Sequence, residues 1–126
     1  MQQKMDGNLI IREYPSQHYK ALFNQQTGFF MRVEDDGYPE PFWAEEGPEL
    51  LDVSITSYCE RGCQFCYRKA NSKGHHIPLE SLRHVIVQAK NAGVFQIALG
   101  GGNPNQHPHF KDVLCMIRET GIVPSY

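Results

Sequence analysis

The chain has 126 residues, of which 40% are hydrophobic and 21% are charged. This composition excludes collagen-like repeats and disordered chains, and the length predicts one main hydrophobic core. The formal net charge is −2 at pH 7, so the chain lacks the strong positive field that attracts a nucleic-acid backbone, and we expect no nucleic-acid partner.

The N-terminal part of the chain predicts a small antiparallel β-meander. Turn residues separate short segments with strand character, which are Leu9–Tyr14, His18–Phe23 and Phe29–Glu34. The next segment, 35–48, holds three prolines and two glycines and predicts a surface linker, pinned to the core by Phe42 and Trp43. We therefore expect residues 1–48 to form the meander and linker, and residues 49–126 to form a second unit.

In this second unit, strands alternate with helices. The predicted strands are Leu50–Ile55, Val94–Leu99 and a third that begins at Ile122. One helix starts at Pro78 and is followed by Gly93, and the other starts near Pro108 and is followed by Gly121. Their apolar stripes are Leu79, Leu82, Ile86 and Ala89 in the first helix, and Phe110, Val113, Leu114 and Ile117 in the second. This alternation predicts an α/β fold with parallel βαβ units, in which sites form at the carboxyl ends of the strands.

Three of the four cysteines lie within eight residues, as Cys59, Cys63 and Cys66, directly after a predicted strand. The chain has no apolar stretch of signal-peptide or membrane-span length, so the crowding indicates metal ligation in a reducing compartment, and we expect a cytoplasmic protein with no membrane contact. Three thiolates can hold three irons of a cubane cluster and leave the fourth iron open. With His75 or His76 they also form a Cys3His set suited to zinc. The residues alone leave both interpretations open.

The remaining candidate ligands have ordinary explanations. Cys115 lies inside the second predicted helix, where we expect a small buried side chain. His107 and His109 flank the start of that helix, and we expect both to be exposed.

The C-x3-C-x2-C spacing, with Phe65 directly before the last cysteine, resembles the radical S-adenosylmethionine (SAM) superfamily. The segment Gly101-Gly102-Asn103-Pro104 is similar to the GGEP segment of that family, with Asn103 in place of the glutamate. The resemblance covers roughly residues 49–126. It implies that this part is the N-terminal portion of a partial (βα)6 barrel, preceded by the β-meander.

The resemblance also implies the cofactors and the chemistry. Cys59, Cys63 and Cys66 would ligate a 4Fe-4S cluster, and Phe65, Gly101, Gly102 and Asn103 would contact SAM. In the family, the reduced cluster cleaves SAM to a 5′-deoxyadenosyl radical that abstracts hydrogen from a substrate. The resemblance thus implies an enzyme with a flavodoxin- or ferredoxin-like electron donor, and peptides or proteins are among the substrates that it allows. A plain turn stays open as the role of the glycine segment.

The predicted elements account for only part of such a core. A full radical SAM core has about six βα units, whereas the pattern here ends at the start of a third strand. We therefore expect an exposed strand edge that another chain covers by completing the barrel. An inactive fragment and a non-catalytic iron-sulfur or zinc module stay open as alternatives.

The predicted cysteine loop carries excess positive charge. Between positions 60 and 76, Arg61, Arg68, Lys69 and Lys73 face one acidic residue, Glu60. Such a patch can counter the negative charge of a cluster or receive an acidic electron donor.

Overall fold

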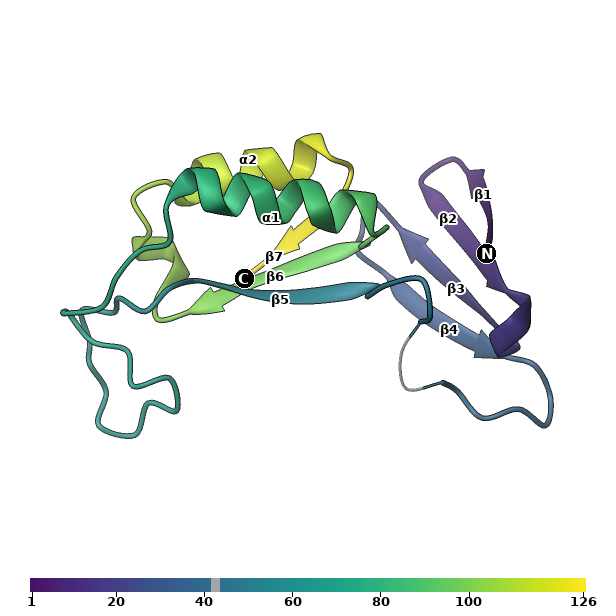
Figure 1. The fold of residues 1–126 in the computed structure, drawn as a ribbon, viewed down its shortest axis with the longest axis horizontal. Coiled ribbons are helices and arrows are strands. Elements are labelled where there is room, and N and C mark those ends of the chain that lie inside the picture. The colour runs from purple at the N-terminus through teal and green to yellow at the C-terminus, as the bar shows by residue number, and fades with distance from the viewer. Residues whose placement is uncertain (42–43) are drawn as a thin grey trace.

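The computed structural model describes residues 1–41 and 44–126, so the predictions for Phe42 and Trp43 lie outside the described residues. In this part of the chain, an antiparallel sheet and a parallel sheet pack against each other, and helices cover one face of the parallel sheet (Figure 1). The predicted α/β class, with an antiparallel meander before a parallel sheet, is confirmed. No described helix is both long and apolar enough to cross a membrane.

The antiparallel sheet has the strand order β1-β2-β3-β4. Its strands are β1 (Gln2–Asp6), β2 (Leu9–Tyr14), β3 (Tyr19–Asn24) and β4 (Phe30–Glu34). The sequence did not predict β1, because all its side chains are exposed and no buried face imposes an alternating pattern. The prediction that a strand starts at His18 is wrong by one residue, since the φ of 56° at His18 ends a short 3-10 turn before β3.

The parallel sheet has the order β5-β6-β7, with strands β5 (Leu50–Thr56), β6 (Gln96–Gly101) and β7 (Val123–Ser125). Helix α1 (Leu79–Asn91) connects β5 to β6, and α2 (Phe110–Glu119) connects β6 to β7. Pro78 is the N-cap of α1, not its first helical residue. The described strands show the start of a parallel α/β unit and do not test the barrel.

Both helices lie on the same face of this sheet (Figure 1). Their buried side chains pack with those of β5 and β6 in one core of Ile55, Leu82, Ile86, Ala89, Val94, Ile97, Leu99, Val113, Ile117 and Ile122. Side chains alternate along a strand, so the register pairs Asp52 with Ala98 and Ser54 with Gly100 on the opposite face. That face carries small and polar residues and has no covering element among the described residues.

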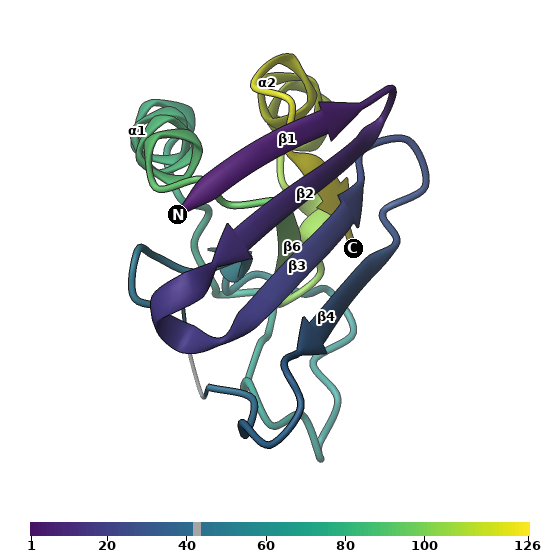
Figure 2. The ribbon, with the colours of Figure 1, turned by 90° about the vertical axis from the view of Figure 1, so that its right-hand side faces the viewer.

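The antiparallel sheet packs at the amino ends of the parallel strands (Figures 1 and 2). Phe95, just before β6, stacks on Phe23 with ring centroids 4.8 Å apart. The Arg12 guanidinium lies over the Phe95 ring, 3.9 Å from its centroid, and donates to the Gly93 carbonyl. Phe95 and Val123 thereby join the core of the meander. The division at residues 48 and 49 stays a prediction.

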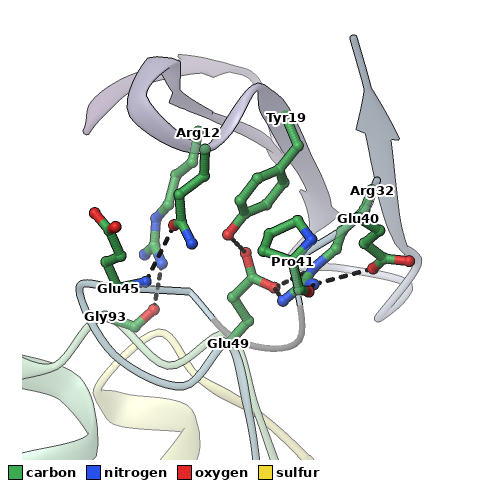
Figure 3. A network of polar contacts seen from close by, with 9 residues as sticks. Arg12, Tyr19, Arg32, Glu40, Pro41, Glu45, Glu49 and Gly93 are labelled. Carbon is green, nitrogen blue, oxygen red and sulfur yellow. Dashed lines mark hydrogen bonds and ion pairs between the residues drawn. The ribbon is translucent and has the colours of Figure 1, made fainter. Parts of the chain in front are cut away.

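Glu49 links the two sheets through both its backbone and its side chain. Figure 3 shows its side chain beside Tyr19 and Arg32. Its carbonyl accepts a 2.8 Å hydrogen bond from the Phe95 N–H. Its carboxylate, on a residue only 5% exposed, accepts from Arg32 Nε at 2.8 Å and from the Tyr19 hydroxyl at 3.3 Å. Burial raises the pKa of Tyr19, and the Glu49 charge raises it further. Burial acts to lower the pKa of Arg32, but the hydrogen bond to Glu49, the Glu49 charge and the hydrogen bond to Glu40 together outweigh it, and the pKa is raised. Arg32 and Glu49 therefore form an ion pair whose carboxylate is buried.

Replacing this carboxylate is expected to destabilise the whole chain. Glu49→Leu leaves the Arg32 guanidinium without its buried partner, and we expect the free energy of unfolding to fall by about 3 kcal/mol in urea titrations. The matched control is Glu40→Leu, because Glu40 contacts the same arginine at 3.0 Å from an exposed position. The control is expected to cost about 1 kcal/mol or less. Equal losses in the two variants would contradict the buried role of Glu49.

Candidate functional site

The chain stays extended beyond β5, and other segments flank residues 56–60 on both sides. On one side, the N–H groups of Ser57 and Cys59 donate to the carbonyls of His75 and Asn71 at 2.8 and 3.1 Å. On the other side, the carbonyls of Thr56 and Tyr58 accept from the N–H groups of Gly102 and Asn103. Successive residues thus bond to opposite neighbours, as in the central strand of a sheet. We call residues 56–60 the stem of the cysteine loop.

The predicted glycine segment is the second neighbour of the stem. The Gly102 N–H donates to the Thr56 carbonyl at 2.7 Å, and the Asn103 N–H donates to the Tyr58 carbonyl at 2.8 Å. A Cβ atom on Gly102 would lie 2.1 Å from the Tyr58 carbonyl oxygen, and one on Gly101 would lie 2.1 Å from that of Thr56. No side chain fits at these positions, so the glycines permit close approach of two backbones. The structure therefore brings together the two predicted motifs.

The Asn103 side chain has a local role. Its Oδ1 accepts from the Asn105 N–H at 3.2 Å and caps the short 3-10 turn Pro104–Gln106. Asparagine suits such a turn because its short side chain reaches the backbone two residues on.

Cys59 lies in the stem, and Cys63 and Cys66 lie in the tip of the loop beyond it. Cys59 and Cys66 are half-buried, Cys63 is exposed, and none of the three is in a disulfide. The Cys66 N–H donates to the Cys63 carbonyl at 3.1 Å. Backbone N–H groups, first that of Ala70 and then that of Arg68, lower the pKa of the Cys66 thiol. The thiols are therefore free and accessible, and one is biased toward its thiolate form.

The aromatic residues of the tip are almost fully exposed. Phe65 is 93% exposed and Tyr67 is 87% exposed. Phe65, predicted to contact SAM, packs against no buried core.

The described residues contain no gathered group of three or more His, Cys, Asp or Glu side chains that could hold a metal ion. Neither the three cysteines nor the predicted Cys3His set is thus arranged as a ready ligand set in this part of the chain. His76 is held against the stem, because its Nδ1 lies 2.8 Å from Thr56 Oγ1. The residues nevertheless fit an iron-sulfur cluster by their chemistry, since three free thiols project from one basic loop with a fixed base.

Two predictions about the surrounding residues are wrong. His107 is 4% exposed, because its Nε2 bonds to the Ile77 carbonyl at 2.8 Å and its Nδ1 accepts from the His109 N–H at 3.0 Å. It therefore ties the segment before α1 to the segment before α2. Cys115 is exposed on α2, since Val113 and Ile117 occupy the buried face of that helix.

Asn71 and Gly74, which the sequence did not single out, hold one side of the stem. The Asn71 carbonyl accepts from both Cys59 and Gly74, and its Oδ1 accepts from the Lys73 N–H at 2.8 Å. A Cβ atom on Gly74 would lie 2.2 Å from the Ser57 carbonyl oxygen. The available signal was the turn composition of Asn71-Ser72-Lys73-Gly74. That composition indicates a turn but not which strand the turn contacts.

The close approach at Gly102 yields a steric test. Gly102→Ala is expected to push the glycine segment off the stem and to lower the free energy of unfolding by about 1–3 kcal/mol in urea titrations. Gly100→Ala is the matched control, because a Cβ atom at Gly100 meets nothing within 4 Å. Equal stability of the two variants would show that the two backbones do not approach as described.

Comparisons with known proteins agree with this arrangement. Residues 53–124 match the Radical SAM superfamily. Over 76 residues the chain is 32% identical to a GTP 3′,8-cyclase of Photorhabdus laumondii subsp. laumondii, a match that covers 58% of this chain and 23% of the cyclase.

A solved structure also resembles the fold. The Streptococcus suis protein SuiB, in its complex with the precursor peptide SuiA, matches with a TM-score of 0.66 and 14% identity over 98% of this chain and 42% of SuiB. The chain thus spans less than half the length of either relative. Since the family match extends over more than half of its residues, this chain belongs to the radical SAM superfamily.

Proposed function

We propose that this chain is part of a radical SAM enzyme in which Cys59, Cys63 and Cys66 ligate a 4Fe-4S cluster. The observation that carries the proposal is the pair of backbone hydrogen bonds from Gly102 and Asn103 to the stem of the cysteine loop. They hold the two motifs of the family side by side at the carboxyl ends of β5 and β6. In parallel α/β sheets, this is the edge at which cofactors bind.

The bound cluster would supply one electron to the sulfonium of SAM, the step that starts hydrogen abstraction from a substrate. The chain itself supplies the thiolates and the geometry. The N–H groups of Gly102 and Asn103 are committed to the stem, so we propose that carbonyl groups of Gly101 and Gly102 accept from the amino group of SAM. Phe65 is free to cover the adenine, and the positive residues of the loop offset the charge of the cluster.

For the substrate we propose a peptide or a protein. The cyclase match covers 58% of this chain, whereas the SuiB match covers 98% and so includes the antiparallel sheet. SuiB is bound to a precursor peptide. The likeness that extends to the N-terminal sheet is thus to a protein that binds a peptide. We further propose an acidic, flavodoxin- or ferredoxin-like electron donor that docks on the basic loop, and a location in the cytoplasm.

Cluster binding is tested by anaerobic reconstitution of the chain with ferrous iron and sulfide. We expect about four irons and four sulfides per chain, with the brown absorption of an iron-sulfur protein. Cys63→Ala is expected to lose most of this iron, and Cys115→Ala to keep it, because Cys115 lies on α2 and outside the loop. Tight zinc binding without iron-sulfur absorption, or equal iron in the two variants, would contradict the proposal.

Cleavage of SAM is a separate test. With dithionite as reductant, the reconstituted chain is expected to release 5′-deoxyadenosine, and Cys63→Ala is expected to release at least about tenfold less. Chromatography of the quenched reaction measures the product. Equal release from both proteins would show that the cysteine loop is not the catalyst.

A further inference from the structure

Gln106 and Glu60 form a reciprocal pair of hydrogen bonds. Gln106 ends the short 3-10 turn that follows the glycine segment, and Glu60 is the last residue of the stem. The Glu60 N–H donates to Gln106 Oε1 at 3.2 Å, and Gln106 Nε2 donates to Glu60 Oε2 at 2.8 Å. Both polar atoms of the glutamine are thus used on one residue. That residue directly follows Cys59.

This pair extends the contact between the two segments by one step. The carbonyls of Thr56 and Tyr58 bond to the backbone of the glycine segment, and Glu60, two residues further, bonds to the Gln106 side chain. Beyond Glu60, the described tip makes no further hydrogen bond to the glycine segment. The hydrogen bonds of Gln106 are therefore the last ones between these two parts of the chain before the loop leaves the stem.

We propose that Gln106 is a positioning residue that fixes Cys59 and Glu60 against the glycine segment. This role rests on the proposed function, because it sets the first cluster ligand relative to the segment proposed to contact SAM. Both hydrogen bonds are exposed, so they add little to global stability. Their effect is local in space, since they join two exposed side chains where the cysteine loop leaves the stem.

The chemistry of the pair suggests a swap. Glutamine matches Glu60 because it accepts from the N–H and donates to the carboxylate. Gln106→Leu removes both hydrogen bonds, and Gln106→Glu places two carboxylates against each other. The double variant Glu60→Gln/Gln106→Glu restores one acceptor for the N–H and one amide-carboxylate hydrogen bond with exchanged partners.

The first measurement is amide hydrogen exchange in the chain without metal. We expect exchange at the Glu60 N–H to quicken roughly three- to tenfold in Gln106→Leu and Gln106→Glu, and to return to within about twofold of wild type in the double variant. Asn105→Leu is the matched control, because Asn105 is an exposed neighbour whose side chain makes no hydrogen bond in the described structure. Urea unfolding is expected to stay unchanged across the set.

The second measurement is made on the reconstituted chain. We expect both single variants to change the electron paramagnetic resonance spectrum of the reduced cluster with SAM added, and the double variant to restore it. Wild-type exchange and spectra in the single variants, a double variant that fails to restore them, or a loss of global stability that accounts for the faster exchange would each overturn the role of Gln106. A wild-type chain that takes up no cluster would overturn the proposed function and this role together.

Discussion

The site depends on the close approach of two backbone segments to the stem, one on each side. The stem lies between the segment that contains Gly74 and the segment that contains Gly101 and Gly102, and a Cβ atom at any of these glycines would lie within 2.2 Å of a stem carbonyl oxygen. Backbone groups make the contacts with the glycine segment up to Tyr58, and the side chains of Gln106 and Glu60 bond where that contact ends. The position of Cys59 thus depends on backbone contacts that a side chain at Gly74, Gly101 or Gly102 would disrupt.

The two ends of the parallel sheet are held by different interactions. At the amino end, charged side chains join the sheets, as Glu49 meets Arg32 and as Arg12 reaches the Gly93 carbonyl. At the carboxyl end, backbone hydrogen bonds join the loops. The antiparallel sheet lies at the amino end and the cysteine loop at the opposite end (Figure 1). The charged network therefore sets the stability of the frame without contacting the loop.

The sequence predicted the parts of this arrangement that carry a periodic or spaced pattern. The apolar stripe of α1 gave its buried face, and the three cysteines marked the loop after β5. The misses have physical causes. Strand β1 buries nothing, and so it has no pattern to find. His107 is buried and bonds to the Ile77 carbonyl, 30 residues away, and to the His109 N–H, 2 residues away. The contact with Ile77 is tertiary, so no local pattern indicates it. Gln106 contacts Glu60 because β5 and β6 lie side by side. The two residues are 46 positions apart, so no local sequence pattern indicates this contact.

The stem and the tip of the cysteine loop differ in how completely the protein specifies them. The stem has its hydrogen bonds on both sides without any metal, whereas the described residues hold no gathered set of ligands at the tip. In small zinc-dependent domains, by contrast, metal binding supplies much of the folding free energy. For this chain, a bound cluster would have to order only the tip, residues 61–70, because the stem that contains Cys59 already has its hydrogen bonds. Cluster binding would then add little to the free energy of unfolding of the chain, because little of the binding free energy is needed to fold it.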